Sequence, residues 1–267
     1  MDPNEFKNFI DIIPEDSRNS LFKPGMKNIG IALNGLFLSV FAPIVKHGLV
    51  KQNEISMFAK GLNDKLQNIP DEKRTDENKL VALKAFEDSR FQLNNSELSE
   101  MFESLIASTF NSDYNDKISP VYSSILSQMS PKTALIFKEW IVNHQSEVAP
   151  LGTIKAKTSD SGSNTIKPGI LILQNGDFVD DSNEHRTRVT IYNVSAELSE
   201  LSYLGLITIK EDAYLTHEMW QPFYQEIADY NHVSIQTFGE KIDEPYLSKG
   251  MASLTELGTN LKELLFN

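Results

Sequence analysis

The chain has 267 residues, with 25 Lys and Arg against 37 Asp and Glu, and it contains no Cys. The absence of Cys excludes disulfides, Cys-ligated zinc, iron–sulfur clusters and thiol nucleophiles. A net charge of −12 argues against a nucleic-acid backbone as the main partner, because such binding depends on clustered Lys and Arg. With 40% hydrophobic residues, the chain can form a core, and its length fits one large or two ordinary domains.

The N-terminal segment carries no targeting signal. Its first 20 residues are acidic and lack the uninterrupted apolar stretch of a secretory signal peptide. We therefore expect a cytoplasmic protein, with peripheral contact at the inner membrane as the alternative.

That alternative comes from residues 28–45, an uncharged run of 18 residues between two lysines. A membrane span needs about 20 predominantly apolar residues, and this run is shorter and contains Asn, Ser and Pro. We expect a helix that is buried in the core and that kinks or ends near Pro43. The residues that would face either the core or a membrane are Leu33, Leu36, Phe37, Val40 and Phe41.

Helical periodicity continues through the first 146 residues, where we expect an all-α bundle. Apolar residues recur every three or four positions in 53–69 and again in 96–109. Asn95 or Ser96 would cap the second of these helices. In it, Glu97, Glu100 and Glu103 would lie on the polar side, opposite the apolar one.

Two further helix starts share one pattern. Ser119-Pro120 and Ser130-Pro131 each place a serine at the N-cap and a proline at the first helical position. Proline fits there because its missing N–H would have no partner in the helix. These pairs predict helices over 121–129 and 132–143.

The composition changes after this bundle. We expect an α+β protein, with a helical domain at 1–146, a Gly-, Ser- and Pro-containing linker or loop at 147–168, and a smaller mixed α/β domain at 169–267. The short strands expected in the second half lie at 170–173, 188–191, 204–210, 233–238 and 252–255.

The order of elements in the last domain suggests a winged helix. A short helix at 194–203 precedes a strand at 204–210, and a later strand leads into a terminal helix at 256–266. Residues 119–267 carry 11 Lys and Arg against 19 Asp and Glu, which favours protein contact over DNA binding. The exposed residues of the short helix would be Ser195, Glu197, Ser199, Glu200 and Ser202.

No catalytic motif is present: there is no Walker loop, no dinucleotide-binding glycine motif, no Gly-x-Ser-x-Gly and no His-Glu-x-x-His. We therefore expect a non-enzymatic protein without cofactor, metal or small-molecule substrate. One acidic turn could hold a hard cation but lacks the ligand alternation of a calcium loop, so a solvated turn is the simpler interpretation. The metal candidates there are Asp177, Asp180, Asp181, Glu184 and His185.

Four segments follow one another within residues 23–140: NIGIALNGLFLSVFAPI, FAKGLNDKLQNIP, ELSEMFESLIASTFN and KISPVYSSILSQMSPKTALIF. In this order they resemble the abortive-infection alpha family of bacterial phage-defence proteins. Later features at 201–207 and 254–258 also agree. The family's Gln-Leu-Ser motif followed by Pro corresponds here to Gln128, Met129, Ser130 and Pro131, with Met replacing Leu.

This resemblance implies a role in abortive infection and assigns no catalytic residue. We expect the protein to act through a protein partner or self-association. The alternatives are a growth-arrest effector that perturbs membranes through helix 28–45 and, less favoured, a winged-helix transcription regulator.

Overall fold

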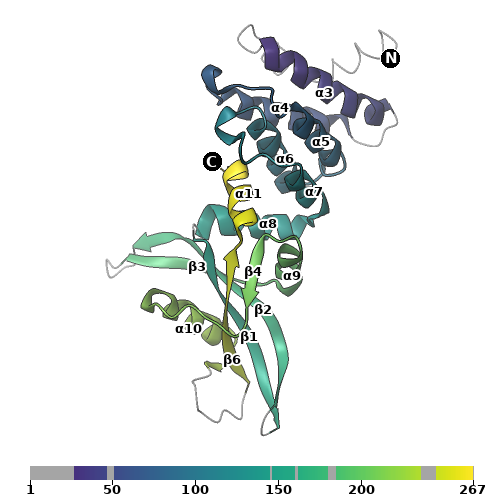
Figure 1. Ribbon diagram of the computed structural model, residues 1–267. Helices are drawn as coiled ribbons and strands as arrows, with labels where there is room; N and C mark the ends of the chain where they lie inside the picture. The colour runs from purple at the N-terminus through teal and green to yellow at the C-terminus, as the bar shows by residue number, and fades with distance from the viewer. Residues whose placement is uncertain are drawn as a thin grey trace. The chain divides into compact units, whose positions relative to one another are not determined.

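The computed structural model describes residues 27–46, 51–144, 146–159, 162–179, 185–235 and 245–266. The chain divides into two compact units (Figure 1). Unit 1 comprises the described residues within 1–134 and 260–267, and unit 2 comprises those within 135–259. The predicted α+β class is confirmed, with a helical N-terminal part followed by a mixed part.

Unit 1 is built from helices whose ends follow the predicted capping residues. The Asn95 side chain accepts a hydrogen bond from Leu98 N (2.8 Å) and caps α6. Val121 N donates to Ser119 Oγ (3.4 Å) at the start of α7. The helices are α3 (Lys27–Lys46), α4 (Gln52–Gln67), α5 (Lys79–Ser89), α6 (Ser96–Ser108), α7 (Val121–Gln128) and the start of α8 (Pro131–Glu139), with 3-10 turns η2 (Asp71–Lys73) and η3 (Ser112–Tyr114).

Helix α3 buries its apolar side in unit 1. The ring of Phe41 packs against Phe58 of α4 (centroids 5.7 Å apart) and edge-on against Phe86 of α5 (6.1 Å). Leu33, Phe37 and Val40 are buried and Leu36 is half-buried, whereas Gly35, Ser39 and Pro43, which are spaced four residues apart, are exposed. Pro43 lies inside the helix, which ends at Lys46. Among the described helices, none has the length and apolarity needed to span a membrane.

Unit 2 contains a mostly antiparallel sheet in the order β3-β2-β1-β6-β4, with β5 pairing parallel to β6 (Figure 1). Its other elements are the π-helical turn η4 (Trp140–His144) at the end of α8, the 3-10 turn η5 (Glu218–Trp220), and helices α9 (Ser195–Tyr203), α10 (Gln221–Tyr230) and the first part of α11 (Glu256–Phe266). The strands are β1 (Val148–Ser159), β2 (Gly162–Val179), β3 (His185–Asn193), β4 (Ile207–Lys210), β5 (Ser234–Ile235) and β6 (Tyr246–Leu254).

Helix α10 covers one face of this sheet. Its Tyr224 and Ile227 join Ile154 of β1, Ile172 of β2 and Leu247 of β6 in one buried cluster. Because side chains alternate along a strand, the buried residues Leu171 and Leu173 point to the opposite face. The sheet is therefore buried on both sides of β2.

The segment 147–168 differs from the expected linker, because it forms β1 and the start of β2. Gly152 serves close packing, because a Cβ there would collide with Leu247 and would press on Ile227 of α10. The Ser, Thr and Asn residues of 163–165 are exposed at the far end of the β1–β2 hairpin. The segment therefore has the glycine and exposed polar residues typical of a linker, although its backbone is hydrogen-bonded to neighbouring strands.

The winged-helix arrangement is not confirmed. Helix α9 leads into β4, and β4 pairs with β6, as that fold requires. However, β6 also pairs with β1, so these elements belong to a larger sheet with a long β1–β2 hairpin. Glu197, expected on the exposed side of α9, is buried in the first turn, where the helix dipole favours a carboxylate.

Candidate functional site

The predicted cation site falls largely outside the described residues. Asp180, Asp181 and Glu184 are not described, and of Asp177 and His185 only the backbone is, in β2 and β3 respectively. The described part of the chain contains no group of three or more His, Asp or Glu arranged to hold a metal ion. Cation binding at this turn therefore stays a prediction.

The four motif residues lie at the junction of α7 and α8. Gln128 is exposed at the end of α7, and Met129 is buried in the core. Ser130 caps α8: its Oγ accepts from Thr133 N (3.3 Å) and donates to Thr133 Oγ1 (2.8 Å). Pro131 is the first residue of α8. Helix capping is thus a sufficient physical reason for the Ser-Pro pair.

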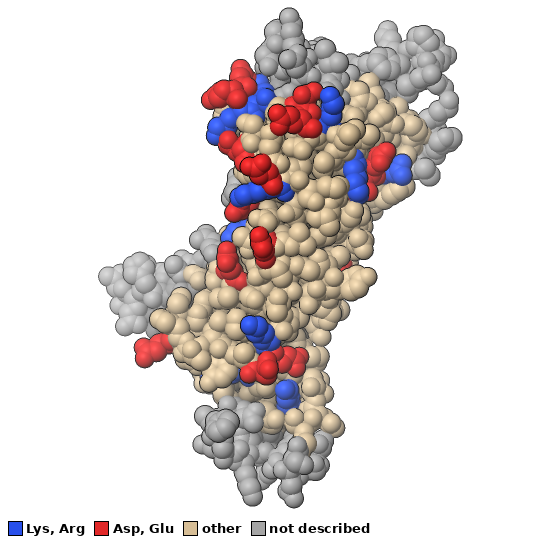
Figure 2. Space-filling view, in the orientation of Figure 1, with Lys and Arg blue, Asp and Glu red and all other residues tan. Residues whose placement is uncertain are grey.

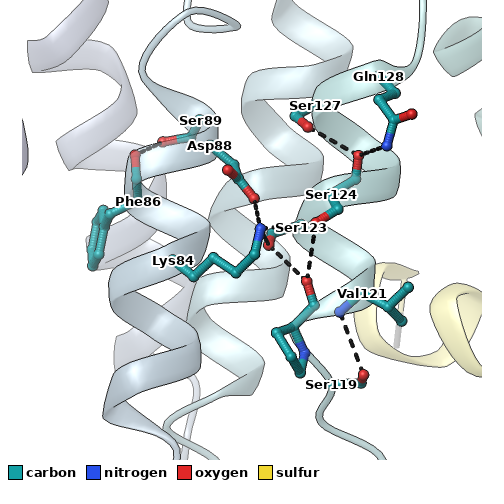
Figure 3. Close-up of polar contacts among 11 residues, drawn as sticks. Lys84, Phe86, Asp88, Ser89, Ser119, Val121, Ser123, Ser124, Ser127 and Gln128 are labelled. Carbon is teal, nitrogen blue, oxygen red and sulfur yellow. Dashed lines mark hydrogen bonds and ion pairs between the residues drawn. The ribbon is translucent and has the colours of Figure 1, made fainter.

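A polar cluster that the sequence did not reveal joins α5 to α7 next to this junction (Figure 3). Lys84 Nζ donates to Ser124 Oγ (2.8 Å) and Ser123 Oγ (3.3 Å) and pairs with Asp88 one turn further along α5. Both serine hydroxyls donate in turn to the Pro120 carbonyl, at 3.1 Å from Ser123 and 3.5 Å from Ser124.

The hydrogen bonds of this cluster determine what it can do chemically. An ammonium group has three donors, and Lys84 uses them on three acceptors. Each serine hydroxyl donates its proton to a backbone carbonyl and accepts from a cation, which is the opposite of the activation that a nucleophile requires. The cluster therefore holds α7 against α5.

We call the cluster of Lys84, Asp88, Ser123 and Ser124 the Lys84 clamp. It places the exposed sides of α5 and α7 next to each other. Gln92 Nε2, just after α5, donates to Ser127 O near the end of α7 (3.0 Å), so the two helices run in the same direction. Helical spacing puts three residues on the exposed side of each helix. We call this area the α5–α7 surface: Leu80, Lys84 and Phe91 from α5 and the turn after it, and Val121, Ser124 and Gln128 from α7.

Glu103 is a second feature, and here the sequence expectation was wrong. Instead of lying on the exposed side of α6, its side chain is only 8% exposed and faces Gly61 of α4. Ser99 Oγ donates to Glu103 Oε1 (3.3 Å), and Lys65 attracts the carboxylate from the next turn of α4. Burial outweighs both and raises the pKa of Glu103 to about 7. The one signal of this burial in the sequence was Gly61, a glycine inside a helix, where another chain segment can approach closely.

His144, at the end of η4 in unit 2, has partners that fix its tautomer. Gln174 N donates to Nδ1 (2.9 Å), so Nε2 carries the proton and donates to Val148 O (2.8 Å). Burial lowers the pKa of this imidazole, although the Val148 bond acts in the opposite direction. The neutral ring thus joins η4 to the beginning of β1 and to β2.

Comparison with known proteins identifies one family. The family model for abortive infection alpha matches residues 50–265. No curated protein and no solved structure matches the chain. Because the match covers most of the chain, the protein belongs to the abortive infection alpha family.

Proposed function

We propose that this member of the abortive infection alpha family is a bacterial phage-defence protein that acts by binding a protein partner. Family membership is the observation that carries the defence role. The mode of action is argued from the α5–α7 surface.

The α5–α7 surface has the composition of a protein contact site. Leu80 is 75% exposed and Phe91 is 64% exposed, and the Arg90 guanidinium lies over the Phe91 ring, 4.9 Å from its centroid. Val121 is also exposed, and Gln128 adds a polar group at the end of α7. The Lys84 clamp is formed within unit 1, so a partner would meet a preorganised surface.

The partner that fits this surface is a protein whose apolar side chains cover Leu80, Val121 and Phe91. Lys84 and Gln128 would lie among these contacts as polar groups. On the face drawn in Figure 2, the described Lys and Arg side chains are interspersed with Asp and Glu, an arrangement unlike the basic patch of a nucleic-acid site.

Phage plating tests the defence role. A sensitive host that expresses the protein should show reduced plaque formation for at least one phage in a broad panel, compared with the empty vector. Unchanged plating throughout the panel would count against the defence role.

Surface variants test the protein-contact mode. We expect the double variant Leu80→Asp/Phe91→Asp to lose protection while keeping its melting temperature, because both side chains are exposed. Met57→Asp is the matched control: Met57 lies on α4, outside the α5–α7 surface, and is 64% exposed. Full protection by the double variant would contradict this mode.

The other mechanisms make different demands on the protein. A membrane-perturbing effector requires α3 to leave its aromatic contacts with α4 and α5. A transcription regulator predicts DNA binding that weakens steeply with salt. Leakage from anionic vesicles and an electrophoretic shift at low salt are the respective assays.

A further inference from the structure

A cavity of about 250 Å³ lies within unit 1, between α4, α6, the η3 turn and the last turn of α11. This volume is somewhat below the range of about 300–1,000 Å³ found for pockets that hold drug-sized ligands, so it suits a smaller molecule. One wall is apolar and includes Ile69, Leu264 and Leu265. The polar lining residues are Lys65, Asn68, Ser104, Ser108, Asn111 and Tyr114.

Ser104 is the strongest sign of a ligand in this cavity. It is only 7% exposed, yet its hydroxyl has no hydrogen-bond partner in the described part of the chain. Ser108, one turn further along α6, donates to Leu264 O (2.8 Å). Among the described residues, the side-chain atoms that are fully buried without a partner are Arg74 Nε and Arg90 Nε, so the Ser104 hydroxyl is open to the cavity and can hydrogen-bond a molecule bound there.

Two further donors are available on the lining. The amide oxygen of Asn111 accepts from Asp113 N (3.1 Å), which leaves its Nδ2 free to donate. The Lys65 ammonium makes no ion pair within the described residues; its charged neighbour is Glu103, which burial keeps partly protonated near neutral pH. These groups, together with Ser104, would bind a carboxylate.

The helix ends around the cavity favour a positive group as well. The last turns of α4, α6 and α11 all line it, and the carbonyl end of a helix carries partial negative charge. Lys65 offsets this charge at the end of α4, whereas the last turns of α6 and α11 contain no basic residue. A simple anion would face two helix ends without a basic residue, and a simple cation would face Lys65. The last carbonyls of α6 already accept hydrogen bonds from Thr109 N, Phe110 N and Asn111 N, so an ammonium group would use their second lone pairs.

We propose that this cavity binds a free α-amino acid. Its carboxylate would lie at Lys65 and Ser104, and its ammonium group at the carbonyl ends of α6 and α11. Its side chain would contact the apolar wall of Ile69, Leu264 and Leu265. A zwitterion matches both signs of charge in one small volume.

Calorimetric titration of the purified full-length protein with each standard L-α-amino acid tests this proposal. We expect saturable binding of at least one amino acid. Lys65→Gln should weaken that binding at least about tenfold, as expected for loss of a hydrogen bond to a charged group. Ser104→Ala should weaken it too, without lowering the melting temperature, because the hydroxyl has no partner to lose. Lys60→Gln, an exposed position on the same helix outside the cavity, should bind like the wild type.

Two analogues of the binding amino acid separate the charges. The N-acetyl derivative lacks the ammonium group and the amide derivative lacks the carboxylate, and we expect both to bind more weakly. Equal binding of either analogue, undiminished binding to both cavity variants, or no binding by any amino acid would overturn the proposal. Because binding is measured on purified protein, none of these results bears on the phage-plating test.

Discussion

Replacing Glu103 by Gln should stabilise the protein at alkaline pH and remove part of its pH dependence. The substitution keeps the shape of the side chain and an oxygen for the Ser99 hydrogen bond, but it removes the charge that is buried against Gly61. The attraction between Lys65 and the carboxylate is also lost, and this attraction is weaker than the effect of burial.

The magnitude follows from proton linkage. The pKa of Glu103 is about 7 in the folded protein, against 4.5 for the unperturbed group. The folded state therefore holds the proton more tightly than the unfolded state, and the stabilisation present below pH 4.5 is lost as the pH rises through 7. The total loss is about 3 kcal/mol, at about 1.4 kcal/mol for each pH unit in this interval.

Urea denaturation of both proteins between about pH 4 and pH 8 measures this difference. We expect nearly equal free energies of unfolding at the acidic end, and a variant more stable by about 3 kcal/mol at the alkaline end. Ser99→Ala is a useful companion, because it removes a partner that favours the charged form, so the loss should extend to higher pH and its total should increase. A variant that is less stable than the wild type at pH 8 would refute the assignment of a buried, destabilising carboxylate.

Three further predictions concern packing and protonation. Gly61→Ala should displace the Glu103 carboxylate, the far end of a flexible side chain, and this should offset the roughly 1 kcal/mol that Ala gains over Gly inside a helix; in a Glu103→Ala background the same substitution should stabilise by about that amount, as a double-mutant cycle in urea measures. His144→Gln should flatten the loss of stability below pH 6.5 that follows from its lowered pKa, a trend opposite in sign to that of Glu103 and visible in the same titrations. Phe41→Ala should cost about 3–5 kcal/mol in urea denaturation whereas the exposed Ser39→Ala should be neutral, and a small loss at Phe41 would favour a detachable α3.

Local signals predicted the parts of the fold that depend on local interactions. Asn95 and the Ser130-Pro131 pair begin helices where a capping side chain and a proline without N–H predict them. Strand β1 was missed because its evidence is distant in sequence: Leu151 pairs with Leu171 on one side and Gly250 on the other. A strand placed between two partners needs no alternating pattern of its own, so its composition resembled a linker.

The candidate sites were missed for a related reason. Lys84 and Asp88 form an ordinary i, i+4 pair on α5, and only the packing of α7 brings two serines to the same ammonium group. Glu103 lies at a position where helical periodicity allows exposure, and the glycine on the facing helix decides its burial. Hydrophobic periodicity describes one helix at a time, whereas each of these sites is formed by the packing of two helices.

The α5–α7 surface and the cavity can be tested separately, although α6 connects them: it lines the cavity and also packs against the two helices of the surface. Helix α6 lines the cavity with Ser104 and Ser108, and it packs against α4, α5 and α7. Any influence of a bound amino acid on the partner surface within unit 1 must therefore change the packing of α6 or of a helix beside it. Ser104→Ala provides the test, because it lies in the cavity and outside the α5–α7 surface and leaves the attraction between Lys65 and Glu103 in place. If this variant loses amino-acid binding and also changes phage plating, while Lys60→Gln changes neither, the two sites are energetically coupled. If plating is unchanged, the partner surface works independently of the ligand.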